Sequence, residues 1–423
     1  MKIYQKNLDE MKEIVSEYTQ ATVDMHIEKS VQDIIQKVIK DGDKALREYS
    51  QKFDGVDVSD FLVPETDLEN AWQTLPENLK NSLLLAKKNI TSFHELEKSN
   101  GFVDASTPGI IRGQKVIPLK RVGLYIPGGT AAYPSTILMN AIPAKIAGVE
   151  EIVMVTPPQK EGINQAVLAA AKLAGIDAVY QVGGAQAIAA LAFGTETIKP
   201  VDKIVGPGNI FVATAKKQVF GQVAIDMVAG PSEIGILADD SACANELAAD
   251  LLSQAEHDKR ARAMLVTNSL QLAKNVANEI EIQLEKLPRK KIAQAAIEDR
   301  SFIAVMENIT DMFSLMNTIA PEHLEIQFND PMEYLGLIKN AGSVFLGRYA
   351  SEPLGDYVAG PNHVLPTGGT ARFSSPLGVY DFVKRTQFIQ FSKAALKADV
   401  AAITTLARTE GLEAHARAIE ARF

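Results

Sequence analysis

From residue 121 onward, short apolar segments with the composition of β-strands alternate with segments that have helical spacing. Strands that alternate with helices in this way form βαβ units, whose strands are parallel. No other feature of the sequence constrains the fold as strongly. The predicted strands of this first unit cover residues 121–127, 151–156, 178–182 and 203–205, and the predicted helices cover residues 135–147, 165–173, 185–192 and 211–218.

A second alternation with different spacing follows the segment Ala229-Gly230-Pro231-Ser232. Its predicted strands cover residues 234–237, 263–267, 302–306 and 343–346, and its predicted helices cover residues 244–256 and 270–287. The sequence therefore predicts two parallel α/β units joined near residue 230. A length of 423 residues is compatible with two to three domains.

The ends of the chain have a different pattern. Residues 1 to about 100 are predicted to be mostly helical, and Thr66-Asp67-Leu68-Glu69 has the form of a capping box, which predicts a helix start. An alanine-rich helix is expected from about residue 400 to 422.

Charge and cysteine content exclude several classes of protein. A net charge of −9 argues against a nucleic-acid-binding protein, which needs a basic face. A single cysteine, Cys243, excludes an internal disulfide and a zinc site built from several thiolates. The N-terminus has no targeting segment, and no uncharged apolar run reaches the ~18 residues needed to cross a bilayer. We therefore expect a cytoplasmic protein without nucleic-acid or membrane partners.

Several familiar motifs are absent or incomplete. Gly206-Pro207-Gly208-Asn209 begins like a dinucleotide fingerprint, but Phe211 occupies the position of the third glycine. No P-loop and no nucleophile elbow occur in the sequence. Cys243 follows acidic residues that would raise the pKa of its thiol, so we expect it to be non-catalytic. His26 and His94 are predicted to be surface residues on polar helices.

Two segments combine side chains that could carry chemistry. In Gln254-Ala255-Glu256-His257-Asp258, the i and i+3 spacing places Gln254 and His257 on one helical face, where both could reach a metal ion. In Pro321-Glu322-His323, a carboxylate next to an imidazole offers two groups able to move protons near neutral pH. From spacing alone, Glu256 is as good a candidate ligand as Gln254. A solvated helix end and a chance Glu-His pair are then the favoured interpretations of the two segments.

Two further segments lie near the C-terminus. Residues 349–375 are rich in glycine and proline but contain Asp356, Asn362, His363 and Arg372, a mixture that favours a functional loop. Glu410 and His415 are five residues apart, an offset of about 140° on a helix, so they converge only if a helix begins between them or packs end-on against the ligand. A surface histidine is the simpler interpretation of His415.

Taken together, the chain resembles the histidinol dehydrogenases, zinc-containing enzymes of the last two oxidations of histidine biosynthesis. The motifs that carry the resemblance occur in family order along nearly the whole chain. They are residues 123–129, 133–136, 183–187, 206–209, 229–233, 253–258 and 321–324, the loop of residues 355–372, and Glu410-Gly411-Leu412.

The resemblance implies two Rossmann-like parallel-sheet domains that lack the glycine fingerprint, with a helical arm at the N-terminus and a helical tail at the C-terminus. It divides the chain into an arm of residues 1–22, a zinc and substrate domain of residues 23–120 with 231–377, an NAD domain of residues 121–230, and a tail of residues 378–423. In the family this tail crosses into the active site of the partner subunit of a homodimer.

The resemblance also implies residue roles and cofactors. It assigns one Zn²⁺ per subunit, two NAD⁺ per substrate molecule, and L-histidinol as the substrate. The implied zinc ligands, which also surround the substrate, are Gln254, His257, Asp356 and His415. The implied catalytic pair is Glu322 and His323; the other substrate contacts are Ser232, His363, Glu410 and again His323, and the NAD contacts are Tyr125, Gln186 and Asn209.

The implied reaction is a four-electron oxidation in which the aldehyde intermediate stays bound. His323 would take the alcohol proton, and Glu322 would activate the water that adds to the aldehyde. The alternatives are a zinc- and NAD-dependent paralogue that oxidises another polar alcohol or diol, a zinc hydrolase, and a non-catalytic binding protein. Glu410 counts against a paralogue specific for a sulfonated diol, because its carboxylate would repel a sulfonate.

Overall fold

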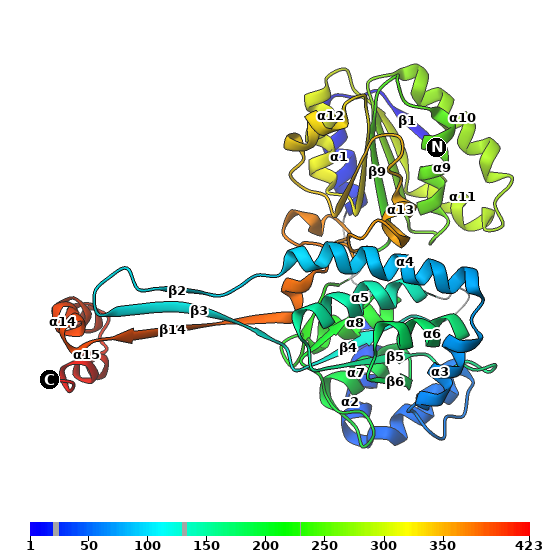
Figure 1. Ribbon diagram of the computed structural model, residues 1–423. Helices are drawn as coiled ribbons and strands as arrows, with labels where there is room; N and C mark the ends of the chain where they lie inside the picture. The colour runs from blue at the N-terminus through cyan, green and yellow to red at the C-terminus, as the bar shows by residue number, and fades with distance from the viewer. Residues whose placement is uncertain (20–24, 129–132, 229) are drawn as a thin grey trace.

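The computed structural model describes residues 1–19, 25–128, 133–228 and 230–423. Gly129, Ala229 and the expected boundary between residues 22 and 23 lie outside the described residues. Figure 1 shows two α/β units, one above the other, and a long arm that leaves the lower unit and ends in a pair of helices. The predicted parallel α/β organisation is confirmed, because every strand pair in both units is parallel.

The lower unit is built on a sheet of strand order β6-β5-β4-β7-β8. Its strands are β4 (Arg121–Tyr125), β5 (Glu151–Thr156), β6 (Ala178–Gln181), β7 (Lys203–Val205) and β8 (Ala224–Ile225). Its crossover helices are α5 (Pro134–Ala147), α6 (Gln165–Ala174), α7 (Gly184–Phe193) and α8 (Ile210–Val219). The central strand β4 is buried along its whole length. From β4 the chain adds β5 and β6 on one side of this strand and then β7 and β8 on its other side. The strand order therefore reverses at β4, and the topological switch point lies between β4 and β7.

The helices before residue 100 also belong to this lower unit. They are α2 (Met25–Tyr49), α3 (Glu65–Thr74) and α4 (Glu77–His94), with the short π-helix η1 (Ser50–Asp54) and the 3₁₀-helix η2 (Glu95–Glu97). Val31 and Ile34 of α2 share one apolar core with Val153 of β5 and Ile188 of α7. The expected grouping of residues 23–120 with residues 231–377 therefore differs from the packing, because the apolar faces of these helices are buried against the five-stranded sheet.

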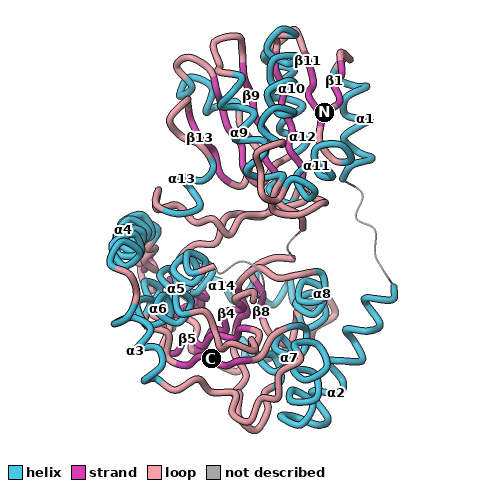
Figure 2. The backbone as a smooth tube through the Cα atoms, turned by 90° about the vertical axis from the view of Figure 1, so that its right-hand side faces the viewer, coloured by secondary structure: helices cyan, strands magenta, loops and turns pink. Residues whose placement is uncertain are grey.

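The upper unit is built on a sheet of strand order β1-β11-β10-β9-β12-β13. Its strands are β1 (Lys2–Tyr4), β9 (Glu233–Ala238), β10 (Arg262–Thr267), β11 (Phe302–Val305), β12 (His323–Gln327) and β13 (Ser343–Leu346). Its helices are α1 (Leu8–Thr19), α9 (Ala244–Ala255), α10 (Leu270–Leu284), α11 (Lys290–Asp299), α12 (Ile309–Ile319), η3 (Pro331–Leu337) and α13 (Glu352–Tyr357). Figure 2 shows β9, β11 and β13 in this unit and β4, β5 and β8 in the other.

The N-terminal residues do not form a separate helical arm. Strand β1 extends the upper sheet by pairing with β11, and Met11 and Val15 of α1 are buried in the same core as Phe313 of α12. The strand was not predicted, because three residues with mixed polarity give no periodic signal.

The projecting arm is an antiparallel sheet of order β14-β3-β2. Its strands are β2 (Phe102–Asp104), β3 (Ile110–Pro118) and β14 (Val383–Phe391), and its terminal helices are α14 (Lys393–Thr409) and α15 (Glu413–Glu420). The single helix expected over residues 400–422 is therefore wrong. The chain breaks at Gly411, whose φ of +75° lies in the left-handed region that ends helices.

Three local predictions are corrected by the structure. His94 is fully buried rather than exposed, and its Nδ1 lies 2.8 Å from a carboxylate oxygen of Glu97. Helix α3 begins after Pro64 without a side-chain cap, so the predicted capping box does not form. The loop of residues 349–375 contains helix α13 and the 3₁₀-helix η4 (Thr370–Arg372), followed by η5 (Val379–Phe382). Among the described helices, none combines the length and the apolar character needed to cross a membrane.

Candidate functional site

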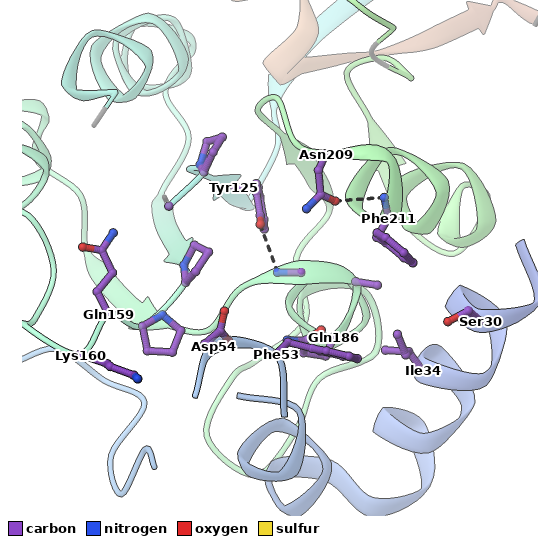
Figure 3. Close-up of a pocket in the computed structure, with 16 residues that line it drawn as sticks. Ser30, Ile34, Phe53, Asp54, Tyr125, Gln159, Lys160, Gln186, Asn209 and Phe211 are labelled. Carbon is purple, nitrogen blue, oxygen red and sulfur yellow. Dashed lines mark hydrogen bonds between the residues drawn. The ribbon is translucent and has the colours of Figure 1, made fainter. Parts of the chain in front are cut away.

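A pocket of about 780 Å³ opens at the carboxyl edge of the five-stranded sheet. Its walls come from the segments that follow β4, β5, β6 and β7, from the first half of α2 and from η1 (Figure 3). The carboxyl edge at a switch point is where open α/β sheets bind ligands. Tyr125, Gln186 and Asn209, the three residues that the family resemblance assigns to NAD, all line this one pocket.

Tyr125 ends β4 and reaches across to the start of α7. Its hydroxyl oxygen accepts a hydrogen bond of 3.1 Å from the backbone N–H of Gly184 (Figure 3). Burial, together with the nearby charge of Asp54, raises the pKa of Tyr125 to about 12, although the Gly184 hydrogen bond opposes this shift. The phenol therefore stays protonated and can donate its hydrogen to a ligand in the pocket.

Gln186 and Asn209 occupy the starts of two neighbouring helices. The Gln186 side chain is 1% exposed, and its Oε1 accepts no hydrogen bond from any described residue. Asn209 caps α8, since its Oδ1 accepts hydrogen bonds from the N–H groups of Phe211 (3.0 Å) and Val212 (3.2 Å). Gln186 therefore lines the pocket with a buried amide oxygen that lacks the partner buried polar atoms normally have.

A buried ion pair holds the turn that precedes Asn209. Lys216 Nζ contacts the Asp226 carboxylate and donates to the carbonyl oxygen of Gly206 at 2.9 Å, while Asp226 Oδ2 accepts from the Gly206 N–H at 2.8 Å. Gly206 has a φ of +111°, and a Cβ there would lie 2.2 Å from the carbonyl oxygen of Tyr125. Glycine at this position lets β4 and the turn approach each other closely.

A second group of chemical side chains lies at the amino edge of the six-stranded sheet, where β9 and β12 begin. The backbone of Glu233 organises it: its N–H donates to Glu322 Oε2 at 3.0 Å, and its carbonyl oxygen lies 3.1 Å from His323 Nδ1. Because a carbonyl oxygen only accepts, Nδ1 carries the imidazole hydrogen and Nε2 keeps the lone pair. His323 Nε2 has no hydrogen-bond partner among the described residues, so no protein donor occupies the lone pair that could accept a proton.

Burial controls the proton affinity of this pair. It raises the pKa of Glu322 well above its ordinary value, an effect that the hydrogen bond from Glu233 opposes. Burial also lowers the pKa of His323 to about 4, and the negative charge of Asp356 opposes that shift. A neutral imidazole is the form that can accept a proton from a substrate.

Asp356 and His363 come from the glycine- and proline-rich loop predicted to be functional. His363 Nδ1 lies 3.0 Å from the Asp356 carbonyl oxygen and 3.7 Å from its carboxylate. Both residues line a cavity of about 240 Å³ together with His323. Burial lowers the pKa of His363. The structure therefore brings this loop and the start of β12 to one site.

Gln254 and His257 lie at the end of α9, as the i and i+3 spacing predicted. Gln254 Nε2 is 3.2 Å from His257 Nδ1, and Gln254 Oε1 is fully enclosed without a partner among the residues described. Electrostatic interaction with His257 also lowers the pKa of His323, which places the two rings close to each other.

Sequence reasoning missed Glu352. Among the described residues, His323, Glu352 and Asp356 form a cluster whose ligand atoms all lie within 4.8 Å of one another, a spacing that suits a metal ion. Glu352 is buried, and its Oε1 lies 3.9 Å from His323 Nε2. Its position four residues before Asp356, on the same helical face, is the signal that could have revealed it.

The remaining predicted site residues divide into one that joins this site and two that do not. Ser232 immediately precedes β9, next to the organising residue Glu233. Glu410 and His415 lie on the terminal helices of the projecting arm, where both are exposed, and the arm carries them away from both units (Figure 1). Within one chain they do not reach the Glu322–His323 pair.

Comparison with known proteins decides the family. The sequence model of the family described as histidinol dehydrogenase matches residues 18–423. The chain belongs to the histidinol dehydrogenase family. The resemblance inferred from the motifs is therefore confirmed.

Individual relatives span the whole chain. The histidinol dehydrogenase of Lactiplantibacillus plantarum is 67% identical over 100% of this chain and 99% of its own length. That of Listeria monocytogenes serovar 1/2a is 56% identical with the same coverage. The crystal structure of histidinol dehydrogenase from Elizabethkingia anophelis matches with a TM-score of 0.95 and 37% identity, covering 100% of this chain and 98% of that one.

Proposed function

We propose that this protein oxidises L-histidinol to L-histidine through a retained aldehyde, the last two steps of histidine biosynthesis, with NAD⁺ as the oxidant. The observation that carries the proposal is the 67% identity, over the full length, to the histidinol dehydrogenase of L. plantarum. A paralogue specific for another alcohol is not favoured, since curated relatives at 56% identity or more over the full length share the same name.

The large pocket of the lower unit fits a dinucleotide. It lies at the switch point, and it presents an unsatisfied acceptor on Gln186 and a protonated phenol on Tyr125. Tyr125, Gln186 and Asn209 would hold the cofactor. Bound NAD⁺ would supply the hydride acceptor for both oxidations.

The upper site fits a divalent metal with nitrogen and oxygen ligands. Gln254 presents an enclosed and unpaired amide oxygen, His257 an imidazole, and Asp356 a carboxylate within a cluster of suitable spacing. These three side chains would hold one Zn²⁺ per subunit, with His415 of a second chain as the fourth ligand. Bound zinc would orient the imidazole and amine of histidinol.

The protein groups then divide the proton transfers. His323 accepts the alcohol proton at Nε2, because Nδ1 is committed to the Glu233 carbonyl oxygen. Glu322, held by the Glu233 N–H, accepts a proton from the water that hydrates the aldehyde. His363 and Ser232 contact the substrate, and Glu410 supplies negative charge for its amine.

The exposed position of the tail supports shared sites in a homodimer. Residues 378–423 would place Glu410 and His415 in the site of the partner subunit, and the same exchange would occur in the other direction. A location in the cytoplasm stays a prediction.

The test is product stoichiometry. Purified, zinc-loaded protein is incubated with L-histidinol and NAD⁺, and NADH is counted against the L-histidine formed. We expect a ratio near two. Turnover of another alcohol without any NADH from histidinol would show that the proposed substrate is wrong.

A further inference from the structure

The large pocket contains an acidic residue that none of the family motifs above includes. Asp54 is the last residue of η1, the short π-helix after α2, and it lines the pocket together with Tyr125 and Gln186. Figure 3 shows its carboxyl group on the pocket wall, on the side that faces Tyr125. Asp54 is also close enough to Tyr125 for its charge to raise the pKa of the phenol.

The Asp54 carboxylate lacks a partner from the protein. Its Oδ2 is enclosed and accepts no hydrogen bond from the part of the chain that the structure describes. Burial raises the pKa of Asp54 to about 6. A half-buried carboxylate without donors is unfavourable, so a water molecule or a ligand that donates to the carboxyl group from the pocket would stabilise its charged form.

The local structure holds Asp54 in place. The ring of the preceding Phe53 stacks on Tyr49 with centroids 5.4 Å apart. Gly55 ends the turn in the left-handed conformation, with a φ of +67°, and its N–H donates to the Ser50 carbonyl oxygen. The carboxylate is thus positioned before any ligand arrives, which lowers the entropic cost of binding.

The acidic side chain on the wall limits what a ligand can offer beside it. Asp54 and Gln186 line the pocket, and an ionised carboxylate only accepts hydrogen bonds, so a ligand next to Asp54 must present a donor. In a dinucleotide the hydroxyl donors are those of the riboses, and a carboxylate is the usual partner of a ribose 2′-hydroxyl in NAD sites. A 2′-phosphate would instead meet a like charge.

We propose that Asp54 is a cofactor-contact residue that accepts a hydrogen bond from a ribose hydroxyl of NAD⁺ and, through its charge, disfavours NADP⁺. This inference rests on the proposed use of a nicotinamide dinucleotide. Lys160 lines the same pocket, and its positive charge would attract the 2′-phosphate of NADP⁺. The negative charge of Asp54 opposes this attraction.

The test compares Asp54→Asn with Asp57→Asn. Both variants lose one negative charge in the same segment, but Asp57 is exposed and does not line the pocket. Binding of NADH and of NADPH is measured directly by nucleotide fluorescence, without substrate, and kcat and KM are measured with NAD⁺ and NADP⁺. Asp54→Ala serves as a second variant, and thermal unfolding identifies any misfolded protein.

For Asp54→Asn we expect NADH binding to weaken at least tenfold, which corresponds to about 1.4 kcal/mol. We also expect the preference for NADH over NADPH to fall by a similar factor, and KM for NAD⁺ to rise. Asp57→Asn should match the wild type in every measurement.

Unchanged affinity for NADH and an unchanged preference in folded Asp54 variants would overturn the inference, as would equal effects of Asp57→Asn. Weaker NADH binding with an unchanged preference would overturn the discriminating role. Failure of the proposed function is distinguishable, because the wild type would then produce no NADH from histidinol, while direct binding would still report on Asp54.

Discussion

At the scale of single residues, the backbone of Glu233 sets the roles of the two neighbours Glu322 and His323. The N–H of Glu233 donates to the carboxylate and its carbonyl oxygen accepts from the imidazole, so the adjacent side chains face the same space. On a regular strand they would point to opposite faces. Glu322 lies just before β12 begins, which permits this arrangement.

Glu322→Gln should slow oxidation of the aldehyde more than oxidation of the alcohol. The amide oxygen can still accept from the Glu233 N–H, so the geometry is kept, but the group can no longer take a proton from water. General base catalysis contributes roughly 10²–10⁴-fold, and we expect a loss in that range for the aldehyde step. Rates with L-histidinaldehyde and with L-histidinol, each at saturating NAD⁺, measure the difference. Equal slowing of both steps would argue against water activation by Glu322.

A buried pair of carboxyl groups makes stability depend on pH. Burial raises the pKa of Glu325 to about 8 and that of its hydrogen-bonded neighbour Asp250 to about 6. Between about pH 4.5, where glutamate ionises in the unfolded chain, and pH 8, the folded protein retains a proton that the unfolded chain has released. Glu325 should therefore make the free energy of unfolding fall as the pH rises through this window, by up to ~1.4 kcal/mol per pH unit. Burial also raises the pKa of Glu352 to about 8, so Glu352 adds a contribution of the same sign.

Glu325→Gln should reduce the slope by up to ~1.4 kcal/mol per pH unit, since the amide has no proton to release. Urea denaturation at intervals from pH 5 to pH 8 measures it, with Glu298→Gln, an exposed glutamate, as the matched control. If Glu325→Gln and the wild type show the same slope, the retained proton belongs to another group.

At the scale of elements, the turn between β7 and α8 depends on one close approach. Gly206→Ala should weaken NAD⁺ binding and reduce stability, because the new methyl group would lie 2.2 Å from the Tyr125 carbonyl oxygen. Relieving that overlap moves β4 away from the turn that carries Asn209. We expect KM for NAD⁺ to rise at least tenfold and the free energy of unfolding to fall by about 2–4 kcal/mol.

Gly221→Ala is the control for backbone strain alone. Gly221 has a similar φ of +105°, but a Cβ there meets nothing within 4 Å. Its substitution should cost about 1–2 kcal/mol and leave KM for NAD⁺ unchanged. Similar effects of the two substitutions would show that strain, and not the contact with Tyr125, explains the result.

Elements whose burial follows a simple period were predictable, and elements that protrude were not. Strands β4 and β5 are nearly continuous apolar runs, as strands covered on both faces must be. Strand β14 is exposed at most positions, so its residues show no apolar periodicity that identifies a strand. Its pairing with β3, from Val383 opposite Pro118 to Phe391 opposite Ile110, is a tertiary fact.

At the scale of the whole molecule, the loop that carries Asp356 and His363 also ties the two units together. Asn362 Nδ2 donates to the carbonyl oxygen of Met139 in α5 at 2.6 Å, and Asn89 Nδ2 of α4 donates to the carbonyl oxygen of Val358 at 2.7 Å. The loop is therefore anchored on the unit that holds the large pocket, although its functional side chains face the upper site.

The exposed tail allows a test of shared sites. His257→Ala and His415→Ala proteins should each be inactive alone, because each lacks one proposed zinc ligand. After subunit exchange, a mixed dimer has one site with both histidines intact, so about a quarter of the wild-type activity should return in an equal mixture. Exchange is verified with two different affinity tags. No recovery in verified mixed dimers would place His415 outside the neighbour's site.

The sequence by itself determined the parallel α/β class, the family, and the local pairs Gln254–His257 and Glu322–His323, because these depend on periodicity and on neighbours along the chain. Only the tertiary structure showed that helices α2–α4 pack on the five-stranded sheet, that Glu352 lies close to His323, and that Asp54 lines the large pocket. It also placed His415 on an arm far from its expected partners. Such contacts join residues that are distant in sequence, and they follow from which apolar faces are buried together rather than from any local pattern.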